Sequence, residues 1–251
     1  MTLVRKETRY GHNYRLDSKP VKGVTTLINA GYPKPALPRW SAKTVAEFVA
    51  DRPDQVEALR AMGRAPMIDA LKAVPWESRD VAAARGTDVH ALADLIIHGQ
   101  EVTPPEHLLG YVQGYIDWLD KHDVEVLHTE RPVANRKWWY AGTFDAIARI
   151  GADVWLLDWK TSTGVYGDNA LQLSAYRGAE FLIDLQGNEL AMPPVDRIGI
   201  VHIRPDGSDL YEVRDPEAAW KDFLHVAWLA KAKDRIDAQL VRIGDDGEVV
   251  A

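Results

Sequence analysis

Apolar residues in the N-terminal half of the chain recur mostly with the 3.6-residue period of an α-helix. This pattern predicts a helix over about 79–98 and another behind Thr103-Pro104-Pro105-Glu106, a capping-box sequence with proline at the first helical position. Residues 62–76 predict a short helix that proline breaks at both ends, and residues 14–28 predict a short β-like entry. We therefore expect the region 1–123 to be mainly helical.

From Val124 onward the apolar pattern changes to one that is typical of β-strands. Three strand-like runs follow one another, namely VEVLHTERPVA, WYAGTFDAIARI and DVWLLDW. A helix is expected next, over about 169–185, followed by the strands RIGIVHIR and LYEVR on either side of a Pro205-Asp206-Gly207 turn. Asp215-Pro216 then begins a final amphipathic helix.

The resulting order of elements over residues 124–251 is β-β-β-α-β-β-α, which predicts an α/β or α+β fold. We expect a central mixed sheet that is flanked by helices. The 251 residues fit a single domain, in which the helical region 1–123 carries His90 and the region 124–251 forms the core.

Composition narrows the classes of function. The chain is 46% hydrophobic and 27% charged, as is ordinary for a globular protein. It has no apolar run of about 18 residues and no apolar signal core near its start, so we expect no membrane partner and a cytoplasmic location. The absence of cysteine excludes thiolate zinc sites and iron–sulfur clusters. A net charge of −7 argues only weakly against a nucleic-acid partner, because carboxylates that hold a metal ion also add negative charge.

Two acids and a lysine interrupt the apolar runs between residues 141 and 162. If Gly151-Ala152 is a two-residue type II′ hairpin loop, Asp145 lies directly opposite Asp158, with Cα atoms about 4.5–5.5 Å apart. Lys160, two residues further on, points to the same face as Asp158. Burying two carboxylates without a partner would cost several kcal/mol, so the hairpin needs a neutralising group.

A hard divalent cation is one such group, because Mg²⁺ takes one or two carboxylates together with water and phosphate oxygens. The alternative is an ordinary ion pair of Asp145 with Lys160, or with Arg149, at a strand end. Short motifs have high false-positive rates, so the spacing of these residues alone favours the ion pair.

Four motifs, RGTDVH, GTFD, LLDWKTS and QLSAY, occur in this order within residues 85–176. Together they resemble the PD-(D/E)XK nuclease superfamily in its RecB-like exonuclease branch. The resemblance implies a restriction-endonuclease-like core, one or two Mg²⁺ or Mn²⁺ ions, and hydrolysis of DNA. The segment PVKGVTTLINAGYPKPALPRW also resembles the opening of phage-encoded members. Some members carry four cysteines for an iron–sulfur cluster, which this chain lacks, and no P-loop is present, so a stand-alone nuclease is expected.

The resemblance implies a set of metal ligands. Asp145 and Asp158 would hold the metal together with His90, and the backbone carbonyl of Trp159 resembles the main-chain ligand of this fold. Glu130, on the preceding strand, is a further candidate. Taken alone, His90 would more often be a hydrogen-bonded core histidine, and Glu130 could equally be a solvated residue at a strand edge.

The remaining catalytic candidates are Lys160, Gln172 and Tyr176. The ammonium of Lys160 would position or help deprotonate the attacking water, or offset charge in the transition state. Gln172 and Tyr176 share a helix face, and the resemblance implies that they orient this lysine or the DNA backbone. It is equally open that they only border a helix packed on the sheet. Asp94, four residues after His90, could orient the imidazole.

Candidate DNA contacts are Arg85, Thr161, Tyr176 and the basic aromatic run that contains Arg136 and Lys137. Such a run can grip phosphates and stack single-stranded bases. The alternative is a hairpin in which at least one of the two tryptophans after Lys137 is buried.

The leading hypothesis is a metal-dependent DNA exonuclease that acts on single-stranded or duplex ends in recombination, end processing or phage DNA metabolism. A bacterial or phage-infected cell is the implied setting, and a single-strand annealing or recombination protein is the implied kind of partner. One alternative is a structure-specific or restriction-like endonuclease. Another is a non-catalytic nucleic-acid-binding module on a nuclease fold.

Overall fold

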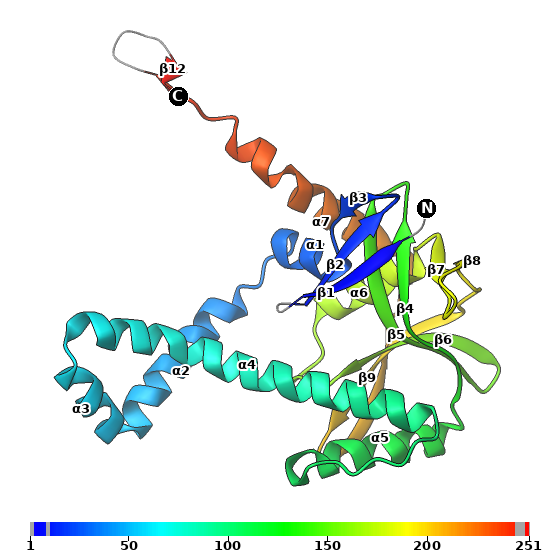
Figure 1. The fold of residues 1–251 in the computed structure, drawn as a ribbon, viewed down its shortest axis with the longest axis horizontal. Helices are drawn as coiled ribbons and strands as arrows, with labels where there is room; N and C mark the ends of the chain where they lie inside the picture. The colour runs from blue at the N-terminus through cyan, green and yellow to red at the C-terminus, as the bar shows by residue number, and fades with distance from the viewer. Residues whose placement is uncertain (1–2, 9–10, 244–248, 251) are drawn as a thin grey trace.

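The computed structural model describes residues 3–8, 11–243 and 249–250. At its centre is a seven-stranded mixed sheet with the order β10-β9-β6-β5-β4-β7-β8, in which β6 and β9 are parallel (Figure 1). Its strands are β4 Glu125–Asn135, β5 Tyr140–Ile150, β6 Asp153–Lys160, β7 Phe181–Ile183, β8 Glu189–Ala191, β9 Arg197–Arg204 and β10 Gly207–Glu212.

Helices cover both faces of this sheet. The helices are α1 Val24–Gly31, α2 Ala36–Asp51, α3 Pro53–Ala61, α4 Arg64–Ile97, the 3₁₀ turn η1 Glu106–Leu108, α5 Leu109–His122, α6 Gly167–Arg177 and α7 Pro216–Asp237. One core lies between the sheet and α1, α6 and α7, and a second lies between the sheet and α4 and α5. The central strands are therefore apolar on both sides, and the predicted α+β fold with a mixed sheet and a helical N-terminal region is confirmed.

Several local predictions hold. The first three predicted strands are β4, β5 and β6, and the last two are β9 and β10. The final helix begins where expected, because the Asp215 carboxylate accepts a hydrogen bond of 2.9 Å from the backbone N–H of Ala218. The predicted hairpin register is also confirmed from the pair Ile150–Asp153 to the pair Ala146–Leu157.

Other local predictions are wrong. Helix α4 runs through the predicted break without interruption, with Pro75 inside it, because proline removes only one hydrogen bond and α2 packs alongside. The helix predicted over 169–185 ends at Arg177, and the missed strands β7 and β8 follow. The sequence at 103–106 does not cap a helix; η1 begins at Glu106, and no side chain caps it.

The predicted β-like entry at 14–28 is half correct. Residues of β2 Gly11–Leu16 and β3 Lys19–Val21 form a small antiparallel sheet with β1 Val4–Thr8. Val24, Leu27 and Ile28, however, lie at helical spacing and bury the inner face of α1 against the large sheet. The small sheet packs against the ends of β4, β5 and β7, which places Arg5 and Tyr14 beside Thr143 of β5.

Two parts of the chain extend away from the large sheet (Figure 1). Helices α2 and α3 and the N-terminal portion of α4 form a helical arm, and α2 buries none of its residues (Figure 1). The C-terminal half of α7 also projects, towards the two-stranded sheet of β11 Arg242–Ile243 and β12 Val249–Val250. Among the described residues, no helix combines the length and apolar character that a membrane crossing requires.

Candidate metal centre

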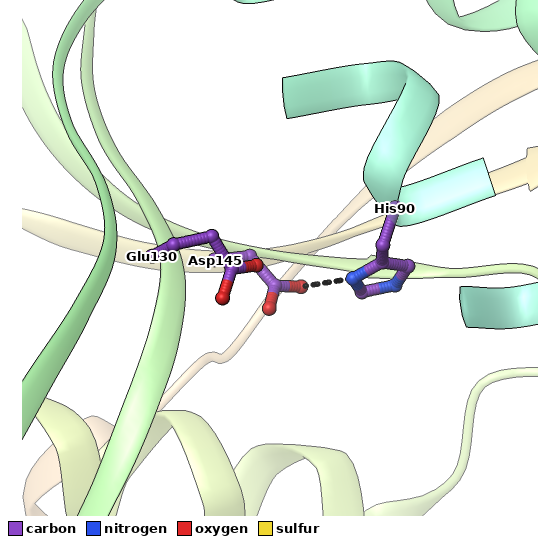
Figure 2. Close-up of side chains that lie close together, drawn as sticks. All are labelled: His90, Glu130 and Asp145. Atoms are coloured by element: carbon purple, nitrogen blue, oxygen red, sulfur yellow. Dashed lines mark ion pairs between the residues drawn. The ribbon is translucent and has the colours of Figure 1, made fainter. Parts of the chain in front are cut away.

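Three potential metal ligands converge where α4 crosses the centre of the large sheet. His90 comes from α4, Glu130 from β4 and Asp145 from β5, and one nitrogen or oxygen atom of each lies within 4.8 Å of the others. Figure 2 shows the imidazole pointing from the helix towards the Asp145 carboxylate, with Glu130 beside it; the distance from His90 Nδ1 to Asp145 Oδ2 is 3.6 Å. We call these three residues the acid–histidine triad.

The backbone of Trp159 orients two members of the triad. Its N–H donates a hydrogen bond of 2.7 Å to Asp145 Oδ2, and its carbonyl oxygen lies 2.8 Å from His90 Nε2. Because a carbonyl only accepts, Nε2 must carry the proton, and the neutral ring then offers its Nδ1 lone pair to a metal. The Trp159 carbonyl was predicted to be a metal ligand. In the structure it accepts a hydrogen bond from the imidazole and so orients the ring, which is the role that was suggested for Asp94.

Glu130 has a strained backbone. Its φ is +48°, although its neighbours Thr129 and Arg131 pair with β5 in a regular antiparallel ladder. A residue other than glycine costs of order 1–3 kcal/mol in this conformation, and such strain gathers at functional sites. Burial, together with the negative charge of Asp145, raises the pKa of Glu130 to about 7. The fold therefore holds the Glu130 carboxylate close to the Asp145 carboxylate, at a cost in the free energy of unfolding.

Asp158 is placed differently from the prediction. It is buried next to the triad, but its Oδ2 lies 2.5 Å from Lys160 Nζ, and its Oδ1 accepts a hydrogen bond of 2.8 Å from Gln172. Burial raises the pKa of Asp158 against the lowering effect of Lys160. Burial lowers the pKa of Lys160, but Asp158 and Asp145 outweigh this, so the net pKa is raised. The structure thus joins Asp145 to His90 and Glu130, and Asp158 to Lys160 and Gln172.

Tyr176 supports this second group from α6. Its hydroxyl accepts a hydrogen bond of 3.3 Å from Gln172, and its ring is buried against β5. A Cβ atom added at Gly142 would lie 2.3 Å from a ring carbon of Tyr176, so no larger residue fits there without movement. A side chain at position 142 would therefore displace the tyrosine of QLSAY from its place against β5.

Three of the predicted DNA contacts, Arg85, Thr161 and Tyr176, lie at this site, and the other two do not. The Arg85 guanidinium donates a hydrogen bond of 3.4 Å to the Thr161 carbonyl, at the end of β6. Arg136 instead forms ion pairs with Asp17 and Glu189, of 2.9 and 2.5 Å. It and Lys137 follow β4, at the far end of the hairpin from Asp145, roughly 17 Å along β5 at about 3.3 Å per residue.

One basic residue at the site, Arg5, was not predicted from the sequence. Arg5, from β1, lies 3.7 Å from Glu130 Oε2 and donates a hydrogen bond of 3.4 Å to the Thr143 hydroxyl. Tyr14, from β2, reaches the same hydroxyl at 3.0 Å. Thr143 is two residues before Asp145 on the same strand, so its side chain points to the same face. Its place at the site could therefore have been predicted from the sequence. No sequence pattern linked Arg5 to a strand so far away.

Unpaired polar atoms are concentrated around the triad. Among the described residues, seven buried side-chain atoms have no hydrogen-bond partner, and four of them border this site. These are Arg5 Nε, Arg85 Nε, Asp94 Oδ1 and Asp158 Oδ2, the last of which has the Lys160 ammonium as its ion-pair partner. Since buried polar atoms are nearly always paired, the cluster has room for charged partners of both signs. The two carboxylates match the oxygen-ligand preference of Mg²⁺ and Mn²⁺, and the imidazole adds a nitrogen ligand that suits a transition-metal ion, so the three residues together fit Mn²⁺ better than Mg²⁺.

Comparisons with known proteins add no functional information. No protein-family model matches the chain, and no curated protein matches it. Among solved structures, the crystal structure of SSO0001 matches with 20% sequence identity and a TM-score of 0.30, over 53% of this chain and 61% of that one. A likeness at this level carries no argument about function.

Proposed function

We propose that the chain is a divalent-metal-dependent nuclease of the PD-(D/E)XK type that hydrolyses phosphodiester bonds in DNA, most simply as an exonuclease. The observation that carries the proposal is the convergence of the acid–histidine triad beside a buried Asp158–Lys160 pair. These residues come from four separate elements and match three of the four sequence motifs, with Glu130 in addition. The unpaired guanidinium nitrogens of Arg5 and Arg85 border the same site and suit an anionic substrate.

Each group has a chemical task in this proposal. Asp145, Glu130 and His90 would hold Mg²⁺ or Mn²⁺, and the ion would supply Lewis acidity for attack on the phosphate. Lys160 Nζ, kept charged by Asp158, offsets negative charge that develops on the phosphate or orients the attacking water. Gln172 fixes the Asp158 carboxylate, so that the ammonium keeps its place.

Arg5 and Arg85 would grip the strand on two sides of the triad. Arg5 lies on the Glu130 side, and Arg85 lies at Thr161, where β6 ends. Guanidinium groups bind phosphates through paired N–H donors, and the unpaired Nε of each arginine is such a donor. Affinity should therefore fall with salt as phosphate contacts do. A cytoplasmic setting and a recombination partner also belong to the proposal.

Cleavage of end-labelled linear DNA tests the proposal. The purified chain should release nucleotides with Mn²⁺ or Mg²⁺ and none with EDTA, and Asp145→Asn should lower the rate at least about 100-fold, as loss of a ligand does. The matched control is Asp153→Asn, on the same hairpin, where the side chain is half exposed and pairs with Arg197. If closed circular DNA were cut as fast as linear DNA, the chain would be an endonuclease rather than an exonuclease. Full activity of Asp145→Asn would refute the metal centre itself.

A further inference from the structure

A pocket of about 570 Å³ lies on the opposite side of α6 from the metal centre. Its walls come from the turn after β4, from α6, from the segment before β9 and from the start of α7. Gln172 and Tyr176 are four residues apart and face the metal centre, whereas Ser174, midway between them, faces the pocket. The volume is within the range of sites for small organic ligands.

The side chains that line the pocket suit a ligand that has a flat ring and a negatively charged group. Trp138 is 40% exposed and meets Trp220 edge to face, with ring centroids 6.5 Å apart, so one of its surfaces is held rigidly at the pocket. The Lys137 ammonium lies 5.4 Å from the centroid of Trp138 and has no ion-pair partner among the described side chains. Pro193 and Pro194 add further flat apolar surface.

Ser174 gives an independent indication that a ligand belongs here. The residue is 1% exposed, forms part of the pocket wall, and its hydroxyl oxygen has no hydrogen-bond partner among the described residues. Other serines of α-helices commonly bond back to a carbonyl of the preceding turn, and this one does not. A hydroxyl both donates and accepts, so it can pair with the polar edge of any nucleobase.

We infer that this pocket binds one nucleotide of a single strand, with the base on Trp138, the base edge at Ser174 and the phosphate at Lys137. Any base can stack on an indole, and the Ser174 hydroxyl can donate or accept, so neither contact selects one base over another. The basic aromatic run after β4 therefore acts here rather than at the metal centre, and only Arg136 is withdrawn from it by its acidic partners. The choice of a nucleotide rests in part on the proposed function.

Calorimetric titration with deoxyadenosine monophosphate in EDTA tests the inference without any metal or cleavage. Saturable binding to one site is expected, and ribose 5-phosphate and inorganic phosphate should bind much more weakly because they have no base. Trp138→Ala should weaken binding about 5- to 150-fold, as the loss of one base stack does. The control is Trp76→Ala, because Trp76 is an exposed tryptophan on α4 with a basic side chain, Arg79, over its ring, as Trp138 has Lys137.

Ser174→Ala separates binding from folding. Removing a buried hydroxyl that has no partner should leave the midpoint of urea unfolding unchanged or higher, while deoxyadenosine monophosphate binds several-fold more weakly. Asp145→Asn should bind this nucleotide like the wild type, so the inference stands even if the metal centre proves inactive. No saturable binding, equal binding by Trp138→Ala, or preferential binding of a tetraproline peptide would overturn the assignment.

Discussion

Replacing Glu130 by glutamine should make the metal-free chain more stable and at the same time unable to bind metal. The pKa of Glu130 is raised from its ordinary 4.5 to about 7 by burial and by the Asp145 carboxylate. Between these two pH values the folded chain keeps a proton that the unfolded chain has released. The free energy of unfolding therefore falls as pH rises through this window, and the full loss is present above about pH 7.

The size of the effect follows from the shift and the exposure. A carboxylate with this shift would cost about 3 kcal/mol if solvent did not reach it, but 40% of the Glu130 side chain is exposed, so we expect about 1 kcal/mol. Glu130→Gln keeps the shape and removes the charge. For a chain of this length, the melting temperature at pH 8 should rise by about 2–4 °C, and the gain should vanish below about pH 4.5.

Thermal unfolding with and without Mn²⁺ is the assay. At about 100 times its dissociation constant, Mn²⁺ should stabilise the wild type by about 2.7 kcal/mol and should leave Glu130→Gln unchanged. Glu125→Gln is the matched control, because Glu125 is an exposed residue of the same strand whose partner is Arg149. A melting temperature below that of the wild type at pH 8, or an undiminished response to Mn²⁺, would refute the role of Glu130.

Three further predictions concern the neighbouring charges. Lys160→Met should abolish cleavage and lower the free energy of unfolding by about 3 kcal/mol, because it leaves Asp158 buried and unpaired; adding Asp158→Asn should restore stability in urea but not cleavage. Arg5→Ala should raise KM about 10- to 100-fold with a smaller change in kcat, and Arg15→Ala, an exposed arginine of the same small sheet, should not. Calorimetric titration of the DNA-free chain with Mn²⁺ should give one tight site, and two tight sites would show that Asp158 exchanges Lys160 for metal.

The sequence predicted most of the large sheet because its information there is local. Alternating or continuous apolar runs specify β4, β5 and β6, and a two-residue loop with glycine at φ +62° specifies their register. Where tertiary packing overrides local signals, prediction failed. Pro75 lies inside a continuous helix that packs on α2, and the short strands β7 and β8 are too brief to show a period.

The candidate site divides in the same way. The hairpin register, which depends only on the loop, is confirmed as far as the pair Ala146–Leu157, the last pair before Asp145 and Asp158. It could not show which acid would face the helix, because that depends on the left-handed turn of the backbone at Glu130 and on α4 delivering His90. The sequence could not predict Arg5 at the site either, because Arg5 reaches it only through the packing of the small sheet against β5.

Charge balance explains why the two acids belong to different groups. Lys160 lies against Asp158, so this pair is neutral and needs no further cation. Glu130 and Asp145, each with one negative charge when ionised, are left with a neutral imidazole whose proton is fixed on Nε2 by the Trp159 carbonyl. One divalent ion matches those two charges. In the proposed metal centre, Lys160 would therefore complement the ion rather than replace it, because its pairing with Asp158 leaves His90, Glu130 and Asp145 as one compact set of ligands for one ion.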